Sequence, residues 1–207
     1  MRTVEWNYDT NKFQMIDQRL LPGEFKVAVF DDYRTVAQAI SGMVVRGAPA
    51  IGAAAAFGLA LAAQQSKSSG PTTLRSDLQT AAETLKKARP TAVNLAWAVD
   101  RILKSVSARL SASASIDEIR SFILAEAQSI ADEDVEINKR MAHHGAALIN
   151  DGDTLIHHCN TGALAAVDLE RRGPVLISHA LDIQLVEGEA QLTRGRTRVA
   201  EGHCRRA

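Results

Sequence analysis

Residues 48–63 form the sequence feature that most restricts the fold, the run APAIGAAAAFGLALAA, which contains no polar or charged residue. Alanine has the highest helix propensity, and Pro49 suits the first turn of a helix. A helix that is apolar on every side must be covered by other elements. The run is about 16 residues long, whereas a membrane span needs about 20. We therefore predict a buried central helix in a globular protein.

Apolar spacing predicts the elements around this helix. Short alternating stretches at residues 4–6, 13–16 and 25–30 are separated by turn residues, which indicates a small antiparallel sheet. Apolar residues three and four positions apart predict further helices. Their expected ranges are 35–43, 74–88, 93–108 and 116–141, the last preceded by the capping sequence Ser115-Ile116-Asp117-Glu118.

The pattern changes near residue 145. A turn at Asp151-Gly152-Asp153 precedes a predicted strand at 154–158, and a helix is predicted at 162–168. This order is typical of a parallel α/β unit, in which ligands bind at the carboxyl ends of strands. We predict the α/β class: an N-terminal small antiparallel sheet plus helical domain over residues 1–145, then the start of a Rossmann-like parallel α/β domain over 146–207.

Composition excludes several classes of function. Lys and Arg number 24, as do Asp and Glu, so the formal net charge is zero and no nucleic acid or membrane partner is expected. Two cysteines, Cys159 and Cys204, are too few for a disulfide scaffold or a zinc site. The polar first residues lack the apolar core of a signal peptide. We expect a cytoplasmic protein without a metal site.

Cys159 lies in the stretch LIHHCNTGALA, between the predicted strand and the next predicted helix. The start of a helix favours an anion, and the same field lowers the pKa of a nearby thiol. This position suits a phosphorylated substrate and a reactive cysteine. The alternative is a small buried apolar side chain without chemistry. For the neighbouring His157 and His158 we favour structural roles.

Two arginines precede other predicted helix starts. Arg46 stands before Gly47 and Ala48 at the start of the alanine-rich run, and Arg89 stands before Pro90. The guanidinium group presents a planar fork that matches phosphate oxygens, and glycine lets the backbone approach a ligand closely. Each arginine can alternatively be an ordinary solvated side chain.

Four stretches together resemble one family. These are TVEWNYDTNKFQMIDQRLLPGE, VVRGAPAIGAAAAFGLALA, RPTAVNLAWAVDR and HCNTGALA. They are similar to the S-methyl-5-thioribose-1-phosphate isomerase family of methionine salvage, over residues 1 to about 168. That family is related to regulatory subunits of a translation-initiation guanine-nucleotide exchange factor and to ribose-1,5-bisphosphate isomerase. The resemblance implies a small sheet with helices, a Rossmann-like second domain and a homodimer.

The resemblance also implies an activity and its residues. The expected reaction converts 5-methylthioribose 1-phosphate, an aldose, to 5-methylthioribulose 1-phosphate, a ketose. Arg46, Gly47 and Ala48 would hold this sugar phosphate, with Arg89 as a further contact to its anionic end. Cys159 would be the catalytic thiol. No metal or organic cofactor is implied.

The resemblance ends after Asp168. The following 39 residues contain seven arginines but no lysine, asparagine or aromatic residue. Translation in a shifted reading frame, or an alternative terminus, would produce such a change. Family members carry a catalytic aspartate, a glutamine and an Asn-Lys pair in that part, and neither Asp182 nor Gln184 is assigned such a role. We expect this chain to be weakly active or inactive, with a poorly ordered tail from about residue 169.

Two other functions remain open. One is a non-catalytic regulatory or sugar-phosphate-binding homologue of the initiation-factor branch, and the other is a ribose-1,5-bisphosphate isomerase. An apolar pocket would favour a methylthio group on the substrate, whereas a second basic cluster would favour a second phosphate. Trp6, Phe13 and Met15 are candidate lining residues for such an apolar pocket, although for each of them we favour a place in the core.

Overall fold

The computed structural model describes residues 2–110, 114–149, 154–157, 162–168 and 198–201. Its N-terminal part holds a three-stranded antiparallel sheet in the order β1 (Val4–Asn7), β2 (Lys12–Ile16) and β3 (Val27–Phe30). Val4 pairs with Met15, and Met15 pairs with Ala28. The predicted antiparallel sheet is therefore confirmed.

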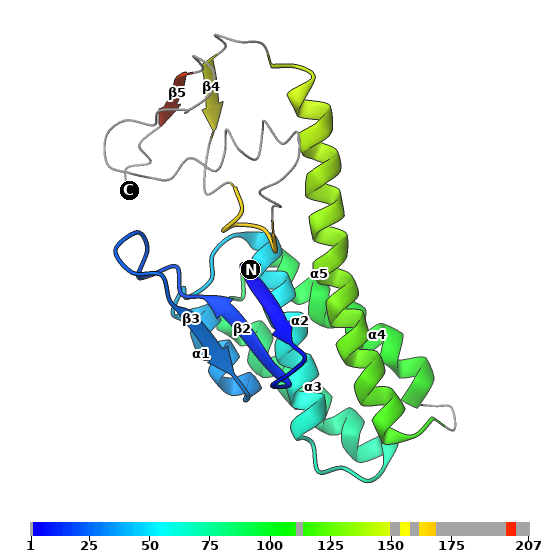
Figure 1. Cartoon of the computed structure of the whole chain (residues 1–207). Coiled ribbons are helices and arrows are strands. Elements are labelled where there is room, and N and C mark those ends of the chain that lie inside the picture. The colour runs from blue at the N-terminus through cyan, green and yellow to red at the C-terminus, as the bar shows by residue number, and fades with distance from the viewer. Residues whose placement is uncertain (1, 111–113, 150–153, 158–161, 169–197, 202–207) are drawn as a thin grey trace.

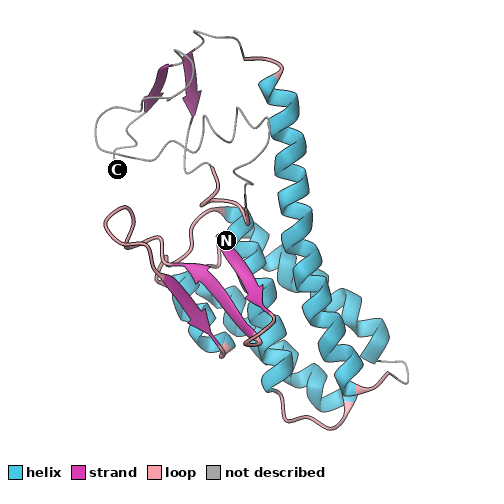
Figure 2. Ribbon diagram, viewed as in Figure 1, coloured by secondary structure: helices cyan, strands magenta, loops and turns pink. Residues whose placement is uncertain are grey.

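Five helices follow the sheet and pack beside it (Figures 1 and 2). They are α1 (Tyr33–Ser41), α2 (Ala48–Gln65), α3 (Pro71–Ala88), α4 (Val93–Leu110) and α5 (Ile116–Ala146). The five helices predicted before residue 145 are all present. α3 begins three residues earlier than predicted, because Gly70-Pro71 provides a helix start within the expected loop.

α2 lies at the centre of the helical layer. It packs against all four other helices and against β1 and β2, and every residue from Ala50 to Ala63 is buried. By length and composition α2 could cross a membrane, but 78% of it is buried inside the protein. It is therefore the core helix that its composition predicts.

Aromatic side chains join the sheet to α2. Phe57 of α2 stacks on Trp6 of β1 at a centroid distance of 6.0 Å and on Phe13 of β2 at 5.3 Å. Phe13 and Met15 are fully buried, and Trp6 is 5% exposed. The favoured interpretation of these three residues as core is confirmed.

Local capping signals form as predicted at the start of α5. The Ser115 hydroxyl accepts a hydrogen bond from the Glu118 N–H, and the Glu118 carboxylate accepts one from the Ser115 N–H. This reciprocal pair satisfies two amides that a helix start leaves free. α5 continues to Ala146, five residues past its predicted end.

The helix predicted at 162–168 is wrong: the segment forms a turn. The Ala165 N–H donates to the Gly162 carbonyl, but the carbonyls of the segment accept hydrogen bonds from distant residues instead of continuing a helix. Thr3 and Gln18 are two of these donors. Tertiary partners thus override the helical propensity of Ala-Leu-Ala.

In the second part of the chain, the described residues include two strands. β4 (Thr154–His157) pairs in parallel with β5 (Arg198–Glu201), and β4 confirms the predicted strand. A full Rossmann-like domain stays a prediction. The expected poor order concerns the tail from about residue 169. Within it, Arg198–Glu201 forms β5, and residues 169–197 and 202–207 lie outside the described ranges.

Candidate active site

Two of the stretches singled out from the sequence meet at the start of α2. Gly47, the N-cap of α2, has a φ of +86°, a conformation that other residues rarely adopt. A Cβ atom built on Gly47 would lie 2.2 Å from the Ala165 carbonyl oxygen. Only glycine therefore allows the segment Gly162–Asp168 to approach the start of α2 so closely.

The first turn of α2 faces this junction without a neutralising group. No side chain caps the helix, and its first turn contains no acidic residue. The Ala50 N–H donates to the Ala165 carbonyl at 3.3 Å. The Ala165 carbonyl thus occupies one amide of the first turn, but no side chain competes with an anion for the positive end of the helix dipole. Ala48, the first residue of the helix, is exposed.

Arg46 directly precedes this helix start. The adjacent Val44 and Val45 are buried in the core, which fixes the backbone at that point. The Nε atom of Arg46 is buried and donates to no acceptor within the described residues. Leaving a buried donor without a partner costs about 1–3 kcal/mol, and more for a charged group. An anion bound at the start of α2 would remove this cost.

Arg89 approaches the same end of the helical layer from α3. It is the C-cap of α3, is partly buried, and is followed by Pro90 and then by α4. A Cβ atom on Gly52 of α2 would lie 3.0 Å from the Asn94 carbonyl oxygen of α4. The first turns of α2 and α4 are thus in contact, so Arg46 and Arg89 precede two neighbouring helix starts.

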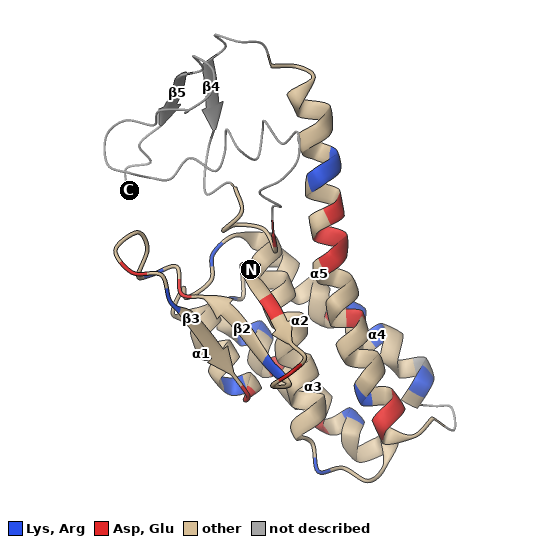
Figure 3. Cartoon of the chain, viewed as in Figure 1, with Lys and Arg blue, Asp and Glu red and all other residues tan. Residues whose placement is uncertain are grey.

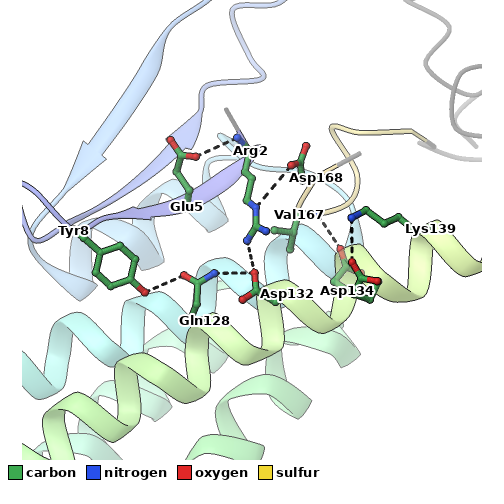
Figure 4. A network of polar contacts seen from close by, with 10 residues as sticks. Arg2, Glu5, Tyr8, Gln128, Asp132, Asp134, Lys139, Val167 and Asp168 are labelled. Atoms are coloured by element: carbon green, nitrogen blue, oxygen red, sulfur yellow. Dashed lines mark hydrogen bonds and ion pairs between the residues drawn. The ribbon is translucent and has the colours of Figure 1, made fainter. Parts of the chain in front are cut away.

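Three side chains from the N-terminal part hold the segment Gly162–Asp168. The Thr3 hydroxyl donates to the Ala163 carbonyl and the Gln18 amide to the Leu164 carbonyl, both at 2.7 Å. On the side of α5, the Val167 N–H donates to an Asp134 carboxylate oxygen at 2.8 Å (Figure 4). Burial raises the pKa of Asp134, while hydrogen bonds from Val167 and Asn138 oppose the rise.

Arg2 adds ion pairs at the same place. Its guanidinium group lies 2.5 Å from an Asp132 oxygen on α5 and 3.8 Å from an Asp168 oxygen (Figure 4). The start of the chain is thereby connected both to α5 and to the end of the segment. These pairs are partly exposed and contribute at most about 1 kcal/mol each.

The middle of α5 is unsuited to an anionic substrate. Acidic residues are clustered along it (Figure 3), and a surface hollow there is lined by three of them, Asp132, Glu133 and Glu136, with Arg140 as its one cationic residue among the described residues. The hollow contains neither Arg46 nor Arg89. The start of α2 is the better candidate for a phosphate. Among the described residues, no group of three or more His, Cys, Asp or Glu is arranged to hold a metal.

Comparison with known proteins identifies the family of this chain. The model of the initiation factor 2 subunit family matches residues 44–180, a range that includes Arg46, Gly47 and the segment Gly162–Asp168. The chain belongs to the initiation factor 2 subunit family. Within this family, a methylthioribose-1-phosphate isomerase of a Synechococcus species is 53% identical over 159 residues, which cover 76% of this chain and 44% of that protein.

Two solved structures are similar to this chain in fold and in sequence. The crystal structure of 5-methylthioribose 1-phosphate isomerase from Pyrococcus horikoshii OT3 has a TM-score of 0.77 at 49% identity, covering 89% of this chain and 50% of that one. Translation initiation factor eIF-2B, subunit delta, from A. fulgidus has a TM-score of 0.71 at 39% identity, over 81% and 47%. The chain spans about half the length of the relatives it matches.

Of the predicted site residues, Arg46, Gly47, Ala48 and Arg89 lie within the described part of the chain. Gly47 is brought directly onto the segment that follows the cysteine stretch, and Arg46 and Arg89 lie at adjoining helix starts. Cys159 lies outside the described residues. Sequence reasoning missed Thr3, Gln18 and Asp134. In the sequence, these three residues are distinguished only as polar residues within or beside an apolar pattern, which does not identify their partners.

Proposed function

We propose that this chain acts on 5-methylthioribose 1-phosphate, as the isomerase of methionine salvage that converts it to 5-methylthioribulose 1-phosphate. The observation that carries the proposal is the start of α2. There the Nε of Arg46, which has no acceptor within the described residues, adjoins a helix start that no side chain caps and that contacts Ala165 at the end of the cysteine stretch. The names of the relatives at 46–53% identity supply the substrate. A cytoplasmic homodimer with a Rossmann-like second domain is part of the proposal.

The chemistry assigns a role to each predicted residue. The substrate carries its phosphate on the anomeric carbon, so the ring must open with the phosphate retained before hydrogen moves from C2 to C1. Arg46 and the start of α2 bind the phosphate, with backbone approach allowed by Gly47. Arg89 supplies a second cationic contact. Cys159 is proposed as the thiol that moves a proton or stabilises the transition state.

A second function is favoured by one observation. The match to eIF-2B subunit delta from A. fulgidus, at a TM-score of 0.71, fits a non-catalytic protein that binds a sugar phosphate without converting it. The two functions share the anion site but differ in turnover. The test is incubation with 5-methylthioribose 1-phosphate, followed by NMR detection of the ketose. Formation of the ketose, even at the weak rate expected from the sequence, supports the isomerase.

Replacement of Arg46 tests the anion site that both functions require. We expect Arg46→Ala to weaken binding of 5-methylthioribose 1-phosphate about 100-fold in calorimetry, because a charge-assisted bidentate contact is lost. Arg46→Lys keeps the charge without the planar fork, so a smaller loss of about tenfold is expected. Arg75→Ala, at an exposed position of α3, is the matched control. Equal affinities of Arg46→Ala and the control would contradict the proposed site.

A further inference from the structure

Gln18 is the residue whose contacts connect both halves of the candidate site. It follows β2, is only 7% exposed, and makes two hydrogen bonds of different kinds. Its backbone N–H donates to the Val44 carbonyl at 2.9 Å, two residues before Arg46. Its side-chain amide donates to the Leu164 carbonyl at 2.7 Å, within the segment that packs on Gly47.

We propose that Gln18 is a positioning residue, which fixes the segment Gly162–Asp168 against the start of α2 so that Arg46 faces the substrate. The backbone bond holds the loop between α1 and α2 that carries Arg46, and the side-chain bond holds the segment Gly162–Asp168. One rigid side chain therefore sets the spacing between the two. The proposal rests on the proposed function, since the substrate of this site is the sugar phosphate named there.

The adjoining contacts explain why this spacing needs a dedicated donor. Gly47 and Ala165 touch at a separation that leaves no room for a Cβ atom, so small displacements of the segment are felt at the start of α2. The Ala50 N–H reaches the Ala165 carbonyl at 3.3 Å, a long hydrogen bond. Without the Gln18 donor, the Leu164 carbonyl loses its hydrogen bond next to Ala165, while Thr3 and Asp134 still hold other residues of the segment.

Two substitutions remove the donor in different ways. Gln18→Glu has nearly the same shape, but its carboxylate cannot donate to a carbonyl and repels it. Gln18→Met removes the polar group without adding charge, and it serves if the buried carboxylate prevents folding. The matched control is Gln38→Glu, at an exposed position of α1.

Residue-resolved hydrogen exchange reads the positioning directly. In both Gln18 variants the amides of Ala50, Ala165 and Val167 should exchange about tenfold faster, while buried amides of α3 keep their protection. Ala50 is decisive, because it belongs to α2 and depends on the Ala165 carbonyl for its acceptor. A residue that only stabilises the fold would speed exchange in α3 equally, and that result would overturn the proposal. Unchanged exchange at Ala50 would overturn it as well.

Substrate affinity gives the functional consequence. Binding of 5-methylthioribose 1-phosphate should weaken about tenfold in the Gln18 variants and stay unchanged in Gln38→Glu. Faster exchange at Ala50 with unchanged affinity would overturn the proposal. If the unsubstituted chain does not bind the sugar phosphate, the proposed function fails, and exchange at Ala50 and Ala165 alone then decides whether Gln18 positions the segment.

Discussion

Gly47 and Arg46 contribute different properties to the proposed anion site. The glycine has a left-handed φ of +86° and lets the backbone of Ala165 come into contact. The arginine places a buried nitrogen without an acceptor beside the helix start. A buried donor that has no acceptor among the described residues favours a ligand that accepts hydrogen bonds.

Gly47→Ala should therefore disrupt the site more than an ordinary loop substitution. An alanine at positive φ costs about 1 kcal/mol or more, and its Cβ would displace the Ala165 carbonyl. We expect a loss of at least about 2 kcal/mol in the free energy of unfolding, measured in urea. Gly23→Ala is the control, because its nearest neighbour would lie at an ordinary 3.6 Å. Similar losses in both variants would contradict this account.

At the scale of the element, α2 organises the protein because its side chains are small. Alanine and glycine let four helices and the sheet approach it on all sides. At Gly52 the backbones of α2 and α4 come close together, since a Cβ atom on Gly52 would lie 3.0 Å from the Asn94 carbonyl oxygen. That contact brings the start of α4, and hence Arg89, beside the start of α2.

Gly52→Ala tests this helix contact. Alanine raises helix propensity by about 1 kcal/mol, so an unconstrained site would be stabilised. Here the added methyl group must push the backbone of α4 away, and overpacking of this kind costs about 1–3 kcal/mol. We expect a net loss of stability in urea unfolding. Gly23→Ala, where the nearest atom would lie at an ordinary 3.6 Å, should show no such loss.

Helices and strands that are determined by neighbouring residues could be predicted from the sequence. The contacts between these elements could not. The apolar composition of residues 48–63 predicts α2, and Ser115 with Glu118 predicts the start of α5. The turn at Gly162–Asp168 depends on donors up to 160 residues away. Local propensity therefore gave a helix, and Gln18 could not be recognised as a partner of Leu164.

At the scale of the whole molecule, α5 connects the N-terminal body to the segment Gly162–Asp168. Asp134 makes this connection by accepting from the Val167 N–H, and Asn138 donates to its other oxygen at 3.0 Å. Val167 is fully buried, so its amide has no water to replace that acceptor. Asp134→Ala should cost about 1–3 kcal/mol in the free energy of unfolding, measured in urea, whereas Asp134→Asn retains an acceptor and should cost less.

The same carboxylate gives this stability a dependence on pH. Burial raises the pKa of Asp134 above its ordinary 3.8, so the folded chain holds the proton more tightly than the unfolded chain. Its contribution is therefore largest below 3.8, falls as pH rises through the raised pKa, and is constant above it. The stability of the unsubstituted chain relative to Asp134→Asn should fall over that window in urea titrations.

A difference that increases with pH would contradict the raised pKa of Asp134. The matched control is Asp9→Asn, at an exposed position of the turn between β1 and β2. Asp9 is exposed, so this variant controls for the removal of one carboxylate away from the segment Gly162–Asp168.

The hydrogen bond between Thr3 and Ala163 can form only late in the synthesis of the chain. These residues are 160 positions apart, so the start of β1 leaves the ribosome long before its partner segment is made. At about 5–20 residues per second, roughly 8–30 s pass before Ala163 is added. During that interval the edge of β1 has no segment to pair with, which makes it the point where a nascent chain of this protein is most open to mispairing or to chaperone capture.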